Sequence, residues 1–293
     1  MAPQVQRTVD AHVHHWDPSR VEWYPFLASD DALRDLGMHD VSAMRRLFDQ
    51  KTYFAEASAW NVQKYVHVSA AVGGEAFLAE TAEREQEAQA TGHPEAIIGT
   101  LDAHASVDAQ LAQLDRQAQA TRFRGIRFAE GIDHASAAGQ AVLRELAERD
   151  LIYDLAVHPD GMADAARALA AFPSLTVVVE HTGWPLSEDS GHVQLWRQGM
   201  SALAELGDRV HCKLSGLAMT LNRFDTAAFR PWIEYCIATF GEDRCFFASN
   251  FPVDGMFGTF DELYTVYAEL TDGLSEQARD ALFAANAERV YRC

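Results

Sequence analysis

Histidine is the residue type that most clearly suggests chemistry in this sequence. His12 and His14 form a His-Val-His pair at the end of an apolar, β-branched run, residues 8–13. On a strand, residues i and i+2 point to the same side, so both imidazoles would face one point. Such a pair can bind a divalent metal, or it can form hydrogen bonds in a pocket without one. His158 and His181 each follow a later apolar run, and we expect all four histidines to share one site.

Basic side chains near the ends of later runs are candidates for contacts with an oxyanion or a carboxylate. Arg124 and Arg127 are three residues apart, so on a regular strand they face opposite ways. We expect one of them in the site and the other at the periphery, and a salt bridge is the alternative role for each. Lys213 and Ser215, at the end of a later run, are further candidates for substrate contacts.

Eight short apolar runs must position these residues, and helical stretches separate them. After the first, the runs recur at roughly 25–35 residues, which is the span of one βα unit. Several are hydrophobic throughout, as in parallel strands buried on both faces. No G-x-G-x-x-G motif follows the first run, which favours a (β/α)8 barrel over an open, doubly wound sheet. We therefore predict an α/β fold, a single (β/α)8 TIM-barrel domain over residues 1–293.

The expected boundaries follow from the apolar runs and from helix-forming segments. Strands are predicted at Thr8–Val13, Lys64–Ala71, Ala96–Asp102, Phe123–Ala129, Leu151–Val157, Leu175–His181, Arg209–Ser215 and Arg244–Ser249. Helices are predicted at Glu75–Thr91, Val107–Ala120, Ala138–Arg149, Met162–Phe172, Val193–Leu206, Ala227–Phe240, Phe260–Leu270 and Ser275–Val290. Ser106 is expected to cap the second of these helices.

One connection, residues 14–63, is much longer than the others. Loops of this length are usually functional or disordered, and this one holds too many aromatic residues for disorder. We expect its first half, with Trp16, Trp23 and Tyr24, to form a lid or wall that contacts the substrate. A structural flap that merely covers the barrel is the alternative.

Composition and charge narrow the classes of partner. The chain has 293 residues, with 24 Lys and Arg against 43 Asp and Glu, a formal net charge of −19 at pH 7. Nucleic acid and anionic membrane surfaces attract cationic proteins, so this balance argues against both. We expect a small-molecule substrate, and an oligomer is compatible with the sequence. The four cysteines lack metal-site spacing and no signal segment is evident, which favours a cytoplasmic location.

A set of motifs in order along nearly the whole chain carries a family resemblance. The motifs lie at Val9–Pro18, Val66–Val68, Arg124–Arg127, Asp154–Leu155, His181–Pro185, Lys213–Leu217, Phe247–Val253 and Asn286–Tyr291. Through them the sequence resembles the amidohydrolase-related TIM-barrel family that includes sugar lactonases and 2-pyrone-4,6-dicarboxylate lactonase. The resemblance implies hydrolysis at the C-terminal face of the barrel.

The resemblance also implies roles for individual residues. Histidines at the positions of His12, His14 and His181 would bind one divalent metal, Zn or Mn, or polarise a carbonyl group. An aspartate that ends the eighth strand usually acts as the base, but this chain has Asn250 there. Asp254 is the nearest carboxylate in sequence. The departure at Asn250 leaves both a metal-bound and a metal-free site open.

The reaction that we predict first is the opening of a lactone by water. The His12 and His14 pair, together with Arg124, would stabilise the developing oxyanion. The candidates for the proton acceptor are His158, His181 and Asp254, and Asn250 is a further candidate for a catalytic role.

Two other functions are compatible with the same residues. One is a metal-dependent hydrolase or decarboxylase of a small carboxylic acid, with a metal-bound water. The other is a ligand-binding barrel that has lost catalysis through Asn250. Turnover on a panel of lactones separates these alternatives.

Overall fold

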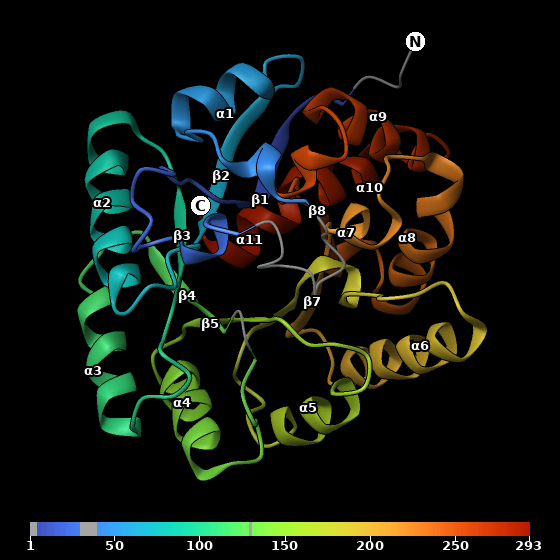
Figure 1. Cartoon of the computed structure of the whole chain (residues 1–293). Coiled ribbons are helices and arrows are strands. Elements are labelled where there is room, and N and C mark those ends of the chain that lie inside the picture. Colours follow the sequence, from blue (N-terminus) through green and yellow to red (C-terminus); the bar gives the residue numbers. More distant parts are fainter. Residues whose placement is uncertain (1–4, 30–39, 129–130) are drawn as a thin grey trace.

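Eight parallel strands form one sheet in the order in which they occur in the chain. The computed structural model describes residues 5–29, 40–128 and 131–293. A bridge between Val13 and Phe251 brings the first strand beside the end of the eighth. The result is a nearly closed (β/α)8 barrel, as predicted, with helices around the strands (Figure 1). The strands are β1 (Thr8–Val13), β2 (Val62–Val68), β3 (Ala96–Thr100), β4 (Phe123–Arg127), β5 (Ile152–Leu155), β6 (Val177–Val179), β7 (Val210–Leu214) and β8 (Cys245–Phe247).

Most strands are shorter than the apolar runs that predicted them. The run 175–181 contains a strand of only three residues, β6, and the run 123–129 contains β4, with Ala129 outside the described residues. The apolar pattern marks buried chain, and that chain continues past the last ladder hydrogen bond. Polar residues at the ends of the runs therefore lie in turns, where the strand alternation of side chains does not apply.

Each predicted helix is present in the structure, which adds α1 (Gln50–Glu56) and α7 (Leu217–Leu221) to them, and polar residues cap several helices. The Ser106 hydroxyl accepts a hydrogen bond from the Ala109 N–H at 3.3 Å, as expected of an N-cap. The predicted last helix consists of two α-helices joined by a π-helical turn, Ala281–Ala285. No helix in the described ranges is long and apolar enough to cross a membrane. The helices are α1 (Gln50–Glu56), α2 (Ala76–Thr91), α3 (Val107–Gln117), α4 (Ala137–Glu148), α5 (Met162–Leu169), α6 (Ser190–Ala204), α7 (Leu217–Leu221), α8 (Thr226–Phe240), α9 (Phe260–Leu270), α10 (Glu276–Asp280) and α11 (Asn286–Tyr291).

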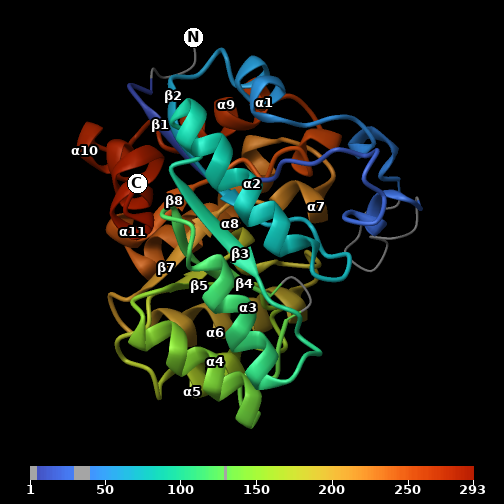
Figure 2. The same cartoon turned by 90° about the vertical axis from the view of Figure 1, so that its left-hand side faces the viewer.

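The two ends of the barrel are closed in different ways (Figure 2). α11 and the C-terminus lie at the end where the strands begin, opposite the long connection after β1. From α11, Ala287 and Tyr291 pack with Val9 and Phe246 of the strands in one buried cluster. The strands finish at the other end of the barrel, which is called the mouth below. A substrate site can form at this end.

The long connection after β1 is packed against the barrel rather than extended over it. Trp16 pairs with Phe48 in an antiparallel bridge and donates from Nε1 to the Met44 carbonyl oxygen at 3.0 Å. The helix α1, which the sequence pattern did not predict, follows with Asp49 as its N-cap. Because these aromatic side chains are buried, this part of the long connection forms a fixed wall next to the end of β1.

Candidate active site

His12 and His14 face each other at the mouth. Their Nε2 atoms lie 3.0 Å apart, and both rings are buried. Lys213 Nζ, which can only donate, lies 3.3 Å from His12 Nδ1; with that nitrogen as the acceptor, the proton of His12 is on Nε2. His12 then donates to His14 Nε2, and His14 donates from Nδ1 to the Val68 carbonyl oxygen at 2.8 Å. In this arrangement one chain of hydrogen bonds orients both rings.

The turn after β6 brings two neighbouring side chains, Glu180 and His181, into the mouth. Consecutive residues on a strand point to opposite faces, but β6 ends at Val179 and His181 has a φ of +52°. Thr182 follows with a φ of +57°, and Trp196 donates from Nε1 to its carbonyl oxygen at 2.9 Å. Left-handed backbone at non-glycine residues is strained, and such strain is concentrated at functional sites.

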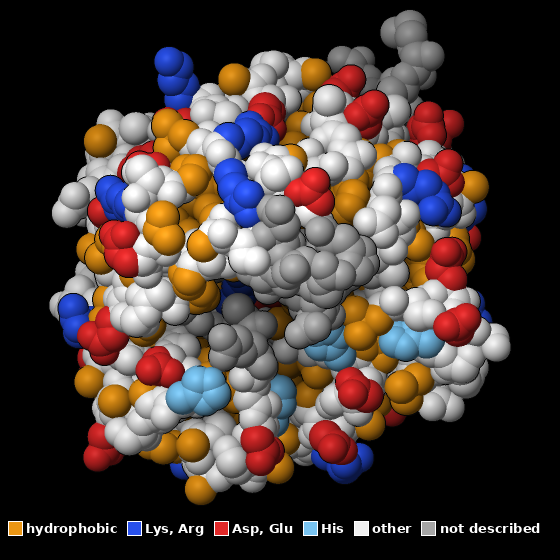
Figure 3. Space-filling view, in the orientation of Figure 1, with side chains coloured by type: hydrophobic (Ala, Val, Ile, Leu, Met, Phe, Trp, Pro, Cys, Tyr) orange, Lys and Arg blue, Asp and Glu red, His pale blue; other side chains and the backbone are white. Residues whose placement is uncertain are grey.

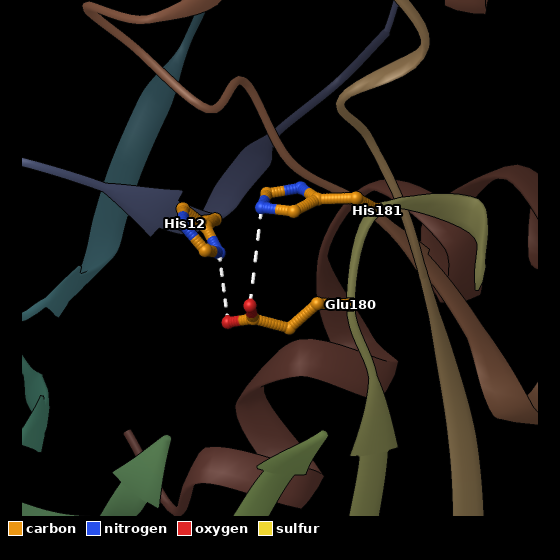
Figure 4. Close-up of side chains that lie close together, drawn as sticks. All are labelled: His12, Glu180 and His181. Atoms are coloured by element: carbon orange, nitrogen blue, oxygen red, sulfur yellow. Dashed lines mark ion pairs between the residues drawn. The ribbon is translucent and has the colours of Figure 1, made fainter. Parts of the chain in front are cut away.

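Three side chains from β1 and the turn after β6 converge on one point (Figure 4). Glu180 Oε1 lies 3.4 Å from His12 Nδ1, and Glu180 Oε2 lies 3.9 Å from His181 Nε2. The three ligand atoms lie within 4.8 Å of one another, and Glu180 Oε1 has no hydrogen-bond partner. Two imidazoles and a carboxylate suit Zn or Mn. The residues fit a divalent metal, with Glu180 in the group in place of the expected His14.

Two cations flank the Glu180 carboxylate. Arg127 Nη1 lies 3.4 Å from Glu180 Oε2, and Arg127 Nη2 donates to the Ser69 carbonyl oxygen at 2.9 Å. Lys213 donates to Asp154 Oδ2 at 2.6 Å and lies 3.9 Å from Glu180 Oε1. Buried charges of this kind persist only when they are paired. Both cations are therefore committed to partners within the protein.

Burial and the flanking charges set the protonation of the cluster. Burial, with added repulsion from the neighbouring cations, lowers the pKa of His12 and of His14 well below the usual range. Burial also lowers the pKa of His181 to about 3, so all three imidazoles are neutral at pH 7. Burial opposes ionisation of Glu180, but the two flanking cations outweigh it and lower the pKa of Glu180. The cluster thus combines neutral imidazoles with one carboxylate.

Arg124 lies at the opposite end of the barrel from the mouth. Its Nε donates to the Tyr291 carbonyl oxygen at 3.0 Å, and its Nη1 donates to the Thr121 carbonyl oxygen at 2.8 Å. Arg124 stands near the start of β4 and Arg127 at its end, a difference of about 10 Å along a strand. The expectation that Arg124 stabilises an oxyanion is therefore wrong, and Arg127 is the arginine at the mouth.

A pocket of about 770 Å³ opens beside the cluster, on the hollowed face that carries histidine side chains in Figure 3. Trp184 forms part of its wall, and the ring of Trp184 meets that of His181 edge-on, with centroids 4.8 Å apart. His158 stacks on Trp184 at 5.4 Å and lines the pocket rather than joining the cluster. Other polar residues of the lining are Asp133, His134, Gln140, Asp160 and the ion pair of Asp164 with Arg167.

Asn250 and Asp254 form a buried pair next to His12. The Asn250 N–H donates to the His12 carbonyl oxygen at 3.0 Å, and the Asn250 side-chain amide donates to Asp254 Oδ1 at 2.8 Å. Burial raises the pKa of Asp254 to about 8, so it is protonated at pH 7. Within the described residues it forms no hydrogen bond or ion pair with Glu180 or His181. A carboxyl group that is mostly protonated at pH 7 and bonded to Asn250 rather than to the cluster suits the role of base less well than Glu180.

The aromatic residues of the long connection differ in their distance from the cluster. Trp16 is 3% exposed, and its ring stacks on that of His14 with centroids 6.2 Å apart. Tyr24 is buried in the hydrophobic core, and Trp23 packs beneath the Arg20 guanidinium, 4.5 Å from the ring centroid. Trp16 therefore forms a wall behind the mouth, whereas the other two pack within the connection.

Two residues expected to contact substrate contact the histidines instead. Ser215 Oγ lies 3.0 Å from His181 Nδ1, and Lys213 is fully buried beside His12. Sequence reasoning missed Glu180, because alternation along a strand assigns it to the face opposite His181. A usable signal was present: Glu180 directly follows three valines of a buried strand, where an unpaired carboxylate would be costly.

Comparison with known proteins shows the family of this chain. The model of the amidohydrolase family matches residues 9–293. The uncharacterized protein y4mH of Sinorhizobium fredii is 32% identical over 298 residues, 97% of this chain and 98% of that protein. An L-fucono-1,5-lactonase of Burkholderia ambifaria is 27% identical over 97% of this chain and 95% of its own length.

Solved structures share the fold over nearly the whole chain. A crystal structure of an amidohydrolase from Burkholderia multivorans with bound zinc has a TM-score of 0.82 and 25% identity, covering 97% of this chain and 99% of that one. A 2,6-dihydroxybenzoate decarboxylase is similar in fold alone, with a TM-score of 0.67, 15% identity, and coverage of 99% and 100% of the two chains. The family match and the lactonase-named relative support a hydrolase. The protein belongs to the amidohydrolase family.

Proposed function

We propose that this protein hydrolyses a lactone, with the carbonyl group of the substrate placed at His12, Glu180 and His181. The observation that carries the proposal is the convergence of one ionised carboxylate and neutral imidazoles at the mouth, beside a pocket. A lactone needs these two elements: a base for the attacking water and a donor for the carbonyl oxygen. The 27% identity to an L-fucono-1,5-lactonase adds support.

Glu180 is the proposed base. Its Oε1 atom has no hydrogen-bond partner and can accept the proton of a water that attacks the carbonyl carbon. The tetrahedral intermediate then collapses, the ring C–O bond breaks, and Glu180 returns the proton to the leaving oxygen. Ser215, as donor to His181 Nδ1 at 3.0 Å, would leave the Nε2–H of His181 to donate to the oxyanion.

The charge of the site favours a neutral, hydroxyl-rich lactone such as a sugar lactone. Arg127 and Lys213 are paired with Glu180 and Asp154, so neither is available to a substrate carboxylate. Among the described residues that line the pocket, the one lysine or arginine is Arg167, and it is paired with Asp164. Arg124, which was a candidate for contact with a carboxylate, lies at the other end of the barrel and cannot contact the substrate. Acidic side chains in the pocket can accept hydrogen bonds from hydroxyl groups.

A divalent metal would be held by His12, Glu180 and His181. When bound, Zn or Mn polarises a carbonyl oxygen and lowers the pKa of a bound water. The Burkholderia multivorans structure with bound zinc supports a metal as an alternative occupant of this cluster. The residues around the cluster bind and orient the substrate in either case.

The alternatives make different demands on the site. A decarboxylase acts on a carboxylate, and the paired cations and acidic pocket disfavour such a substrate. A ligand-binding barrel needs no base, so the ionised Glu180 with its unpartnered oxygen disfavours that function. We therefore favour hydrolysis of a neutral small molecule.

The test is turnover on a panel of neutral sugar 1,5- and 1,4-lactones and one pyrone dicarboxylate, followed by acid release with a pH indicator. We expect a neutral lactone to be hydrolysed and the Glu180→Gln variant to lose about 100-fold or more in kcat. The control variant is Asp254→Asn, which keeps the shape and the neutral state of its side chain and should retain most of the wild-type kcat.

Each other result has a definite meaning. Preference for the dicarboxylate contradicts the substrate class, and release of CO₂ from a carboxylic acid supports the decarboxylase. Saturable binding without turnover supports the ligand-binding barrel. A Glu180→Gln variant that remains folded and fully active removes Glu180 as the base.

A further inference from the structure

Lys213 faces the same atoms that would hold a metal. Its Nζ lies 3.3 Å from His12 Nδ1 and 3.9 Å from Glu180 Oε1. His12 Nδ1 is also the ring nitrogen that faces Glu180, at 3.4 Å. One positive charge therefore already lies against two of the three members of the ligand group.

Asp154 and Tyr291 keep the ammonium group of Lys213 beside His12 and Glu180. Lys213 donates to Asp154 Oδ2 at 2.6 Å, and the Tyr291 hydroxyl donates to Asp154 Oδ1 at 2.9 Å. The Nζ atom also lies 5.3 Å from the centroid of the Tyr291 ring, a cation–π distance. The side chains of all three residues are fully buried. A lysine side chain is usually flexible, but here the contacts of Nζ with Asp154 and with the Tyr291 ring restrict its position.

We propose that Lys213 is a built-in cation of this site, that it supplies the positive charge facing His12 and shares with Arg127 the charge facing Glu180, and that it keeps the affinity of the cluster for divalent metal low. The ammonium takes the place in which a metal would balance the buried Glu180 carboxylate. The site is then ready to bind a substrate carbonyl without loading of a metal.

Competition between the two cations has a simple physical basis. An ammonium has no lone pair and cannot serve as a ligand, and it repels a divalent ion strongly where the effective dielectric is low. A metal bound through His12 Nδ1 must displace Lys213 from that nitrogen. Displacement weakens the pairing of Asp154, and a buried carboxylate without its cation is costly.

The experiment is a calorimetric titration with Zn²⁺ alone, on protein first dialysed against EDTA and then against buffer. We expect Lys213→Met to bind one equivalent of Zn²⁺ about tenfold or more tightly than the wild-type protein. Equal or weaker binding by Lys213→Met overturns the proposal. So does a wild-type protein that keeps about one equivalent of zinc through the EDTA step, measured by elemental analysis.

Matched variants separate competition from loss of structure. The double variant Lys213→Met with Asp154→Asn removes both charges of the ion pair, so no unpaired aspartate remains to cause misfolding. It should show the same gain in zinc affinity as Lys213→Met alone. Lys64→Met removes a lysine that pairs with Glu288 at the other end of the barrel, and its affinity should equal that of wild type. Adding Glu180→Gln to Lys213→Met should abolish the gain, because it removes a ligand.

Zinc affinity is measured without substrate, so the result of this test does not depend on the result of the lactone panel. Tight zinc binding by the wild-type protein contradicts the role of Lys213 and leaves hydrolysis of a lactone intact. Absence of lactone turnover contradicts the proposed function and leaves the competition between Lys213 and zinc intact.

Discussion

Two buried carboxyl groups near the mouth have opposite protonation states, for reasons that lie in their immediate neighbours. Glu180 lies between Arg127 and Lys213, and these cations hold its pKa below the usual value despite burial. Asp254 has the neutral amide of Asn250 as its hydrogen-bond partner, and burial raises its pKa to about 8. At pH 7 the first is an ionised carboxylate and the second is a neutral hydrogen-bonding group.

The protonation of Asp254 predicts a pH-dependent effect of Asp254→Asn on stability. Below about pH 4 both folded and unfolded chains hold this proton, whereas between about pH 4 and 8 only the unfolded chain loses it. The wild-type protein therefore loses stability from this group as the pH rises through that window. Asparagine does not titrate, so the variant should gain relative to wild type by up to about 1.4 kcal/mol per pH unit.

Urea unfolding at pH 5 and at pH 7.5 measures this difference. A larger relative stability of Asp254→Asn at pH 7.5 than at pH 5 is the expected result. A difference in the free energy of unfolding that is the same at both pH values would mean that Asp254 is ionised in the folded protein.

At the scale of elements, the turn after β6 depends on a close approach by the turn after β7. Gly216 has a φ of +70°, and a Cβ atom placed there would lie 2.7 Å from the Cβ, Cγ and Nδ1 atoms of His181. Gly216→Ala should therefore displace His181 and lower kcat about 10-fold or more, in addition to a loss of about 1–3 kcal/mol in stability from the left-handed backbone.

Gly207 offers a matched control for this variant. It has a φ of +92° and no atom within 4 Å of the position of an added Cβ. Gly207→Ala should lose stability through the backbone alone and keep the wild-type kcat. Steady-state kinetics and thermal unfolding of both variants check the prediction, and equal kcat values for the two would show that Gly216 does not position His181.

The repeating elements could be predicted from the sequence, because each βα unit carries its own local pattern. The buried runs located all eight strands, and the position of His12 and His14 at a strand end placed them together correctly. Strand alternation failed at β6, because the left-handed turn brings Glu180 and His181 to the same side. The predicted start of the fourth strand, Phe123, agrees with β4, so Arg124 was already placed at the end away from the mouth, and the error lay in giving it a role in the site.

At the scale of the whole molecule, some contacts that shape the site join distant parts of the chain. The ion pair of Asp154 with Lys213 links β5 to β7, and Tyr291 reaches Asp154 from α11. No local pattern encodes such a contact, since each partner alone is an ordinary polar residue in a buried run. This is why the sequence predicted a site at the mouth but not which charges are paired within it.

The net charge of the molecule predicts how salt affects its choice of substrate. A formal charge of −19 and the acidic lining of the pocket repel an anion, whereas a neutral lactone is unaffected. Raising the ionic strength from about 0.01 M to about 0.15 M shortens the screening length from about 30 Å to about 8 Å. The kcat/KM of a carboxylated lactone should therefore rise with salt, while that of a neutral lactone of the same ring size stays constant. Steady-state kinetics on the two lactones at each salt concentration give the answer, and a carboxylated lactone whose kcat/KM falls with salt would reveal a cationic contact at the site.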